Sequence, residues 1–142
     1  MFITHQPISL IDFFGERSDE LCGAIASFVG IVRGRQGGRR VKKLYYDCYQ
    51  SMADQEIGLI IDQIKREYKV NEIRVLHRVG WLEVGEAAIV ISVRAVHRNE
   101  AFSACRAVID QIKEGVPIWK KETYADGISE WISCAHYSEV IP

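Results

Sequence analysis

Two segments with helical periodicity, each flanked by strand-like segments, constrain most strongly how this chain can fold. Apolar side chains recur at intervals of three and four residues in 52–68 and again in 98–113, which predicts two amphipathic helices. Alternating or continuous apolar patterns predict strands at 41–49, 73–79, 87–96 and 118–124. The order from Val41 onward is therefore strand, helix, strand, strand, helix, strand, the split βαβ order of ferredoxin-like folds.

Further elements are expected on both sides of this unit. The uncharged segment 22–32 predicts a buried strand, and 128–134 is expected to close a hairpin that turns at Asp126-Gly127. An amphipathic piece at 8–14 predicts a short docking turn. A length of 142 residues suits one domain. We therefore predict an α+β protein, a two-layer sandwich with a mostly antiparallel sheet, in a single domain over residues 1–142.

Local signals indicate where the elements begin and end. Ser51 is a candidate N-cap for the first helix, and Gly115 followed by Pro117 predicts the end of the second. The run Glu83-Val84-Gly85-Glu86 predicts a tight connection that joins 73–79 and 87–96 as a hairpin.

The run Arg33-Gly34-Arg35-Gln36-Gly37-Gly38-Arg39-Arg40 breaks the pattern of strands and helices. It holds four arginines and three glycines in eight residues, which predicts a flexible basic loop. It matches neither G-x-x-x-x-G-K-[ST] nor G-x-G-x-x-G, the common glycine-rich motifs for nucleotides. Such a flexible cationic loop beside a strand end is a candidate for binding an anion or a partner protein.

Composition excludes several classes of protein. With 18 Lys+Arg against 19 Asp+Glu, the net charge of −1 gives no overall attraction to nucleic acid or anionic membranes. The sequence contains no apolar run of membrane-spanning length and no secretory signal at its beginning, so we predict a cytoplasmic protein. The four cysteines, Cys22, Cys48, Cys105 and Cys134, are scattered without a C-x-x-C pair, which favours reduced thiols over a zinc site. No metal or cofactor is expected.

The candidate chemistry is cationic. His97-Arg98 lies where a strand becomes a helix, and the free N–H groups of a helix N-terminus favour an anion. The alternative is a surface arginine beside a capping histidine. Lys113, in the last turn of the same helix, is electrostatically favoured there and is equally consistent with a structural role.

Lys120 and Lys121 are consecutive on a predicted strand, so their side chains point to opposite faces. One of them is therefore able to enter a site with Arg33 and Arg98, where neighbouring cations would lower a lysine pKa and favour nucleophilic or proton-transfer chemistry. A solvated charged face is the alternative. The tryptophans, Trp81, Trp119 and Trp131, are expected in the core or at an interface.

Five ordered motifs between Cys22 and Trp131 carry a family resemblance. They are FVGIVR (28–33), YQSMADQE (49–56), HRVGWLEVGE (77–86), VHRNEAFSACR (96–106) and VPIWKKE (116–122). Together they closely resemble the large, catalytic subunit of molybdopterin synthase, a family whose fold is described as an α/β hammerhead.

The resemblance implies a sulfurtransferase of molybdenum cofactor biosynthesis. Such an enzyme converts cyclic pyranopterin monophosphate into molybdopterin by inserting two dithiolene sulfurs. The sulfur arrives as a thiocarboxylate on the C-terminal Gly-Gly tail of a small ubiquitin-like subunit. The large subunits form a central homodimer with a small subunit at each end, which gives a heterotetramer.

Motif matching places five residues on the family's active-site positions: Arg33, His97, Arg98, Lys113 and Lys120. The arginines suit a phosphate, because a guanidinium binds phosphate oxygens with two parallel hydrogen bonds. His97 is expected to position that phosphate or to move a proton as the cyclic phosphodiester opens. The two lysines are expected to stabilise the oxyanion formed at the donor carbonyl or to accept the acyl group transiently.

The chain departs from the family in two places. The loop after Arg33 carries more charge than is common, so no single contact from residues 34–40 is carried over. The run Ile132-Ser133-Cys134-Ala135-His136 lacks the basic residue that commonly follows the Trp131 position and reaches the neighbouring protomer's site. His136 is a candidate substitute. Two other functions stay open: a non-catalytic ferredoxin-like module that binds a ligand or RNA, and a dimeric scaffold with surface cations.

Overall fold

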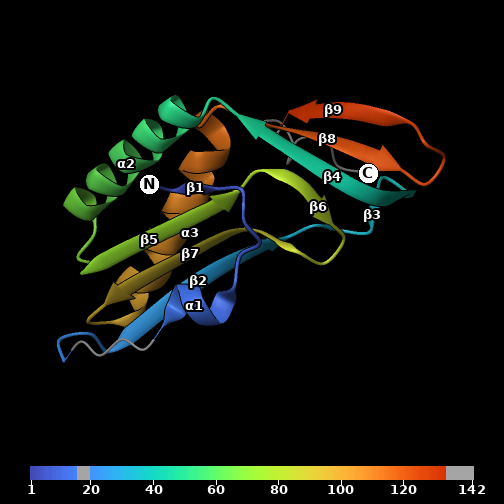
Figure 1. Ribbon diagram of the computed structural model, residues 1–142. Helices are drawn as coiled ribbons and strands as arrows, with labels where there is room; N and C mark the ends of the chain where they lie inside the picture. The colour runs from blue at the N-terminus through green and yellow to red at the C-terminus, as the bar shows by residue number, and fades with distance from the viewer. Residues whose placement is uncertain (16–19, 134–142) are drawn as a thin grey trace.

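The most apolar strands form the first sheet of the computed structural model, which describes residues 1–15 and 20–133. Its order is β1 (Ile3–Thr4), β5 (Glu72–Arg78), β7 (Ala87–Ala95) and β2 (Ala24–Ile31) (Figure 1). Only β1 and β5 run parallel; the other neighbours are antiparallel. Eight of the nine residues of β7 are buried, as its apolar sequence predicts for a central strand.

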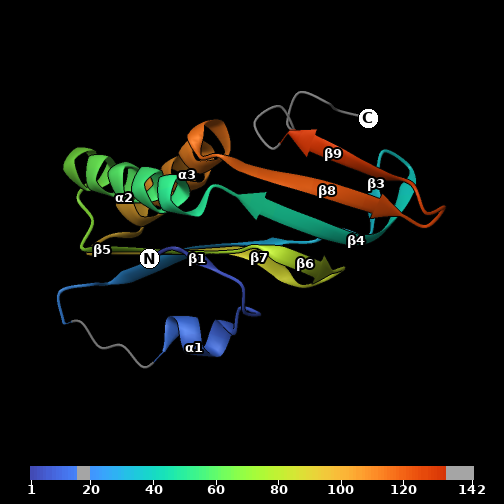
Figure 2. The ribbon, with the colours of Figure 1, turned by 45° about the horizontal axis from the view of Figure 1, so that its top comes forward.

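Two long helices, α2 (Gln50–Glu67) and α3 (Arg98–Gly115), cover one face of this sheet. Their apolar stripes, at Ile57, Ile61 and Ile64 of α2 and at Val108, Ile109 and Ile112 of α3, join the main core. Figure 2 shows the short helix α1 (Leu10–Phe14) on the opposite face of the sheet. The Ser9 side chain caps α1 by accepting a hydrogen bond from the Asp12 amide.

The second sheet lies on the same side of the first sheet as α2 and α3 (Figure 2). It contains β3 (Arg35–Gln36), β4 (Arg39–Cys48), β8 (Ile118–Tyr124) and β9 (Ser129–Ser133), and β6 (Gly80–Glu83) also pairs with β4. The β8–β9 hairpin turns at Asp126-Gly127, as expected. Gly127 has a φ of 86°, and the Asp126 carboxylate accepts a hydrogen bond from the Ile128 amide.

The α+β class and the predicted order of elements are confirmed, but the strands divide between two sheets. In a ferredoxin-like sheet the 41–49 strand would pair with 87–96. Here β2 pairs along the whole of that edge of β7, from Ala24 to Ile31. Because β2 occupies the edge, β4 does not pair with β7, and β4 and β8 pair with each other in the second sheet.

The arginine- and glycine-rich segment is a tight β-hairpin, not the flexible loop that its composition suggests. Arg35 and Gln36 pair with Arg40 and Arg39, and the two residues between the strands are Gly37 and Gly38. Both glycines have positive φ angles, 58° and 81°. Two-residue turns of this kind match the twist of the paired strands, and glycine adopts them without steric cost.

Three smaller expectations are also corrected. The 22–32 strand is not buried on both faces, because β2 is an edge strand on which Ile25 is 53% and Ile31 58% exposed. Tyr49, not Ser51, occupies the N-cap of α2, and it makes no side-chain capping bond. The strands β5 and β7 do pair antiparallel, but β6 lies between them in the chain and pairs with the second sheet.

Candidate active site

A cavity of about 400 Å³ lies where the first sheet, the end of α3 and the inner face of the second sheet meet. Apolar side chains from these elements form much of its wall, including Phe28, Ile89 and Ile112. Its polar lining comes from five residues on separate segments: Arg33, Tyr46, His77, Lys113 and Lys120. An apolar cavity with a few converging polar groups is the usual form of a small-molecule site.

The three cations reach the cavity through ordinary features of the fold. Arg33 follows the end of β2, and Lys113 stands in the last turn of α3. Lys120 lies on β8 opposite Tyr46 of β4, and both side chains face the cavity. Alternation turns Lys121 to the outer face, where its ammonium lies 5.5 Å from the ring centroids of Trp81 and Trp131. The prediction that the two lysines point to opposite faces is confirmed.

A buried carboxyl group stands next to Lys120. Glu122 is 2% exposed, and its Oε1 lies 4.0 Å from the Lys120 Nζ. Burial raises the pKa of Glu122, while the nearby charges of Lys120 and Arg33 act to lower it. Glu122 therefore provides a negative charge or a hydrogen-bond acceptor next to Lys120.

His77 is a neutral imidazole in the wall of the cavity. Burial lowers the pKa of His77 to about 4, and the nearby charge of Lys113 adds to this effect. Its Nδ1 lies 2.8 Å from the Arg78 carbonyl oxygen. A carbonyl oxygen only accepts, so Nδ1 carries the hydrogen and donates this hydrogen bond. Tyr46 packs edge-on against the imidazole, with 5.0 Å between ring centroids. The ring is therefore fixed as a hydrogen-bond acceptor through Nε2.

The sequence analysis missed Tyr46, His77 and Glu122. Each sits on a strand among residues that alternate into the core, so each has the pattern of an ordinary packed side chain. His77 follows Ile73 and Val75 on the buried face of β5. The only signal for it is its place at the start of the HRVGWLEVGE motif, which by itself does not separate a core histidine from a site residue.

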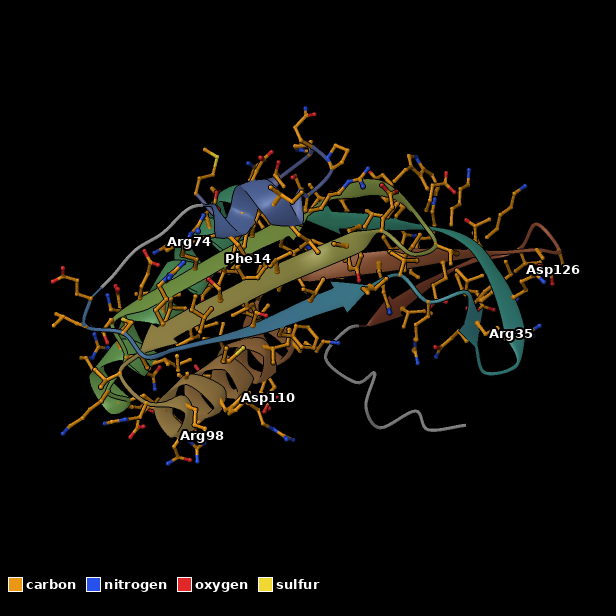
Figure 3. The ribbon with its side chains drawn as sticks, turned by 90° about the horizontal axis from the view of Figure 1, so that it is seen from below. Phe14, Arg35, Arg74, Arg98, Asp110 and Asp126 are labelled. Carbon is orange, nitrogen blue, oxygen red and sulfur yellow. The ribbon has the colours of Figure 1, made fainter. Side chains whose placement is uncertain are left out.

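His97 and Arg98 do not line this cavity. They are exposed at the N-terminus of α3, with His97 in the N-cap position. Lys113 lies fifteen residues farther along the same helix, roughly 22 Å away at 1.5 Å per residue. Figure 3 shows Arg98 at the opposite end of the molecule from Arg35. Within one chain, the structure brings together Arg33, Lys113 and Lys120 but not His97 and Arg98.

Other expectations concern cysteines, metals and the end of the chain. Cys22, Cys48 and Cys105 are free thiols, and residues 1–15 and 20–133 contain no cluster of three or more His, Cys, Asp or Glu arranged to hold a metal ion. No helix among these residues is long and apolar enough to cross a membrane. Cys134 and His136 lie outside the described residues.

Comparisons with known proteins agree with one another. A family model described as MoaE protein matches residues 3–115. The chain is 41% identical over 129 residues to the molybdopterin synthase catalytic subunit of Thermoplasma volcanium, covering 91% of this chain and 94% of that protein. It superposes on the crystal structure of molybdopterin synthase from Staphylococcus aureus with a TM-score of 0.86 and 34% identity, covering 92% of this chain and 95% of that chain.

A more distant structure shares the fold alone. It is a protein–protein complex of subunits 1 and 2 of molybdopterin-converting factor from Helicobacter pylori. The TM-score is 0.65 at 22% identity, and the match covers 80% of this chain and 73% of that chain.

Proposed function

This chain belongs to the MoaE family, the catalytic subunits of molybdopterin synthase in molybdenum cofactor biosynthesis, and we propose from this premise that its cavity converts cyclic pyranopterin monophosphate into molybdopterin. The two dithiolene sulfurs come from the C-terminal thiocarboxylate of a small ubiquitin-like subunit. One observation supports this best: Arg33, Lys113 and Lys120, from three distant segments, line one cavity. Both the phosphorylated substrate and the sulfur donor are anions, and converging cations offset their mutual repulsion.

We assign the phosphate end of the substrate to Arg33, whose guanidinium is able to hold two phosphate oxygens at once. Arg33 lies at the edge of the cavity, and the Gln36 side chain accepts a hydrogen bond of 2.6 Å from its Nη2. Gln36 belongs to β3 of the hairpin, so this hydrogen bond lets the hairpin orient the Arg33 guanidinium. His97 and Arg98 remain proposed phosphate ligands, but they would have to act on the cavity of a second copy of the chain.

Lys113 and Lys120 are proposed to act on the donor carbonyl. When a nucleophile, either water or a lysine amine, adds to the donor carbonyl carbon, negative charge develops on the carbonyl oxygen, and an ammonium directed at that oxygen stabilises it. The acyl–sulfur bond then breaks, the carbonyl reforms, and the sulfur leaves with the bond's electron pair. Either lysine is also able to accept the acyl group, provided that it first loses its proton. Glu122, 4.0 Å from the Lys120 Nζ, is suited to hold that ammonium in place.

The partners follow from the same proposal. The complex from Helicobacter pylori joins two subunits of molybdopterin-converting factor, and we propose an equivalent small sulfur-carrying subunit for this chain. The homodimer and the heterotetramer of the sequence analysis stay predictions, as does the cytoplasmic location. The predicted single domain over 1–142 is kept as part of the proposal.

Reconstitution tests the proposed function. The purified chain alone is expected to be inactive, and adding the thiocarboxylated small subunit with cyclic pyranopterin monophosphate is expected to give dithiolene product. The Lys113→Ala/Lys120→Ala variant is expected to lose at least about 100-fold in turnover, because the charge that each lysine directs at the carbonyl oxygen stabilises the transition state more than the bound substrates. The product is measured by chromatography after oxidation to a fluorescent pterin.

The matched control is Lys65→Ala/Lys69→Ala, which removes two lysines on and just after α2. It is expected to turn over as the wild type does. Circular dichroism checks that both variants fold. Wild-type turnover in Lys113→Ala/Lys120→Ala would reject the proposed lysine roles and would favour the scaffold with surface cations.

A further inference from the structure

A second cationic surface lies beside the active-site cavity and has no part in the function described so far. Arg35, Arg40 and Lys42 are exposed and border a hollow of about 550 Å³, together with Gly34, Val41 and Val84. We call these three cations the hairpin patch. Among residues 1–15 and 20–133, no acidic residue lines the hollow and none forms a salt bridge with the patch.

The pairing within the hairpin is electrostatically unfavourable. Arg35 lies directly opposite Arg40 in the β3–β4 register. Like charges at directly opposed positions of an antiparallel pair destabilise the sheet. The repulsion between Arg35 and Arg40 therefore lowers the stability of the folded hairpin, and a bound anionic group would offset that repulsion.

The third arginine of the hairpin is used differently. Arg39 lies 3.2 Å from Glu130 and 3.9 Å from Asp126, and its guanidinium stacks 3.5 Å from the centroid of the Tyr124 ring. Through these contacts, Arg39 connects the β3–β4 hairpin to the β8–β9 hairpin. With the glycine turn between the strands, they hold the backbone of the patch in a defined position while Arg35 and Arg40 stay exposed.

The hairpin patch is continuous with the active site. A small cavity of about 40 Å³ shares Arg35 and Val41 with the hollow, and it shares Arg33, Tyr46 and Lys120 with the active-site cavity. Cationic side chains therefore extend from the surface of the hairpin to the lysines of the site, and the buried Glu122 also lines the small cavity between them. A chain end that is anionic and extended would be attracted along this path.

We propose that the hairpin patch docks an acidic face of the sulfur-donor protein and directs its C-terminal tail toward the active-site cavity. This inference rests on the proposed function, since it concerns the donor of that reaction. Charge complementarity of this kind orients two proteins and speeds their association. A nucleic acid is the less suitable occupant, because the chain has a net charge of −1 and none of the described residues that line the hollow is aromatic, as base stacking would require.

Direct binding tests the patch separately from catalysis. The probe is the small subunit with an ordinary C-terminal carboxylate, which binds but transfers no sulfur, and affinity is measured by calorimetry at two salt concentrations. Arg35→Glu/Arg40→Glu is expected to raise the Kd at least about tenfold at low salt, because four units of charge change at the interface. The salt dependence of the Kd is expected to weaken in the same variant.

The matched control is Lys65→Glu/Arg66→Glu on α2, which changes the net charge by the same amount and is expected to bind within about twofold of the wild type. Arg35→Gln/Arg40→Gln provides a milder change if the reversed charges disturb the fold. Equal weakening in the patch and control variants would overturn the proposal. The proposal would also be overturned if the chain bound a DNA duplex through the patch and did not bind the small subunit.

Turnover at limiting small subunit separates this inference from the proposed function. If the wild type makes dithiolene product and the patch variant does so equally well, the docking proposal fails and the proposed function stands. If the small subunit binds through the patch but the wild type makes no product, the proposed function fails and the docking surface stands.

Discussion

At the scale of single residues, the proposed active site combines exposed and buried ionisable side chains. Lys113 is exposed at a helix end, whereas His77 is only 6% exposed within β5. The pKa of His77, about 4, is too low for it to take a proton from a lysine ammonium, whose ordinary pKa is near 10.4. We therefore infer that His77 accepts a hydrogen bond and does not act as a general base.

The lowered pKa of His77 predicts a pH dependence of stability. The unfolded chain protonates this histidine near pH 6.5 and the folded chain only near pH 4, so protonation favours unfolding as the pH falls through this window. Between pH 7 and pH 5 the wild type is expected to lose about 2 kcal/mol of unfolding free energy through His77 alone. Urea denaturation at both pH values measures the loss.

The variant His77→Gln is expected to lose about 2 kcal/mol less than the wild type over the same interval, because its side chain does not titrate. His97→Gln serves as the control, since His97 is exposed at the N-cap of α3. An unchanged pH dependence in His77→Gln would contradict the assignment of a neutral, buried imidazole.

At the scale of secondary-structure elements, β2 decides the architecture. It pairs along the edge of β7 that β5 does not occupy, and Gly23, the residue before β2, approaches the end of β7 closely. The amide of Gly23 donates a hydrogen bond to the Ala95 carbonyl at 3.1 Å. A Cβ added at Gly23 would lie only 2.6 Å from the Val96 carbonyl oxygen, so the backbones meet this closely only with glycine at position 23.

The variant Gly23→Ala is therefore expected to be destabilised by about 1–3 kcal/mol, because the clash is with backbone atoms that have no other rotamer. Gly58→Ala is the matched control. It lies inside α2, where the added Cβ would meet Phe2 at an ordinary 3.6 Å. Alanine is favoured over glycine in a helix, so this variant is expected to gain about 0.5–1 kcal/mol. Chemical denaturation of both variants tests the opposite signs.

The same scale shows what the sequence was able to predict. The helices and most strands follow from local periodicity, and Arg33, Lys113 and Lys120 are recognisable as charges at the ends or on alternating faces of those elements. The division into two sheets depends on the competition between β2 and β4 for one edge of β7, which local patterns do not contain. Glu122 is recognisable as a site residue only from the structure, where β8 places it next to Lys120 and in the wall of the small neighbouring cavity.

At the scale of the whole molecule, the surface suggests association. The outer face of the second sheet carries Trp81, Trp119 and Trp131, which are 47%, 47% and 58% exposed. The sequence left open whether these residues belong to the core or to an interface, and this exposure excludes the core. Exposed aromatic side chains are typical of protein interfaces, which is consistent with the predicted homodimer.

The predicted homodimer would also account for the separation of the five predicted site residues. His97 and Arg98 lie roughly 22 Å from Lys113 along α3, too far to share a substrate within one chain. We propose that, in the predicted homodimer, the N-terminus of α3 in one copy serves the cavity of the other. The proposed site would then combine lysines from one copy with the histidine–arginine pair of its partner.

Mixing two inactive variants tests this arrangement. Lys113→Ala/Lys120→Ala and His97→Ala/Arg98→Ala are each expected to be inactive alone. After subunit exchange at equal concentrations, half of the dimers are mixed, and each mixed dimer holds one cavity with intact lysines that faces an intact histidine–arginine pair. About one quarter of the wild-type activity is therefore expected to return. Activity that stays at the level of the separate variants would show that all five residues act within one chain, and full activity of His97→Ala/Arg98→Ala alone would show that this pair has no part in the reaction.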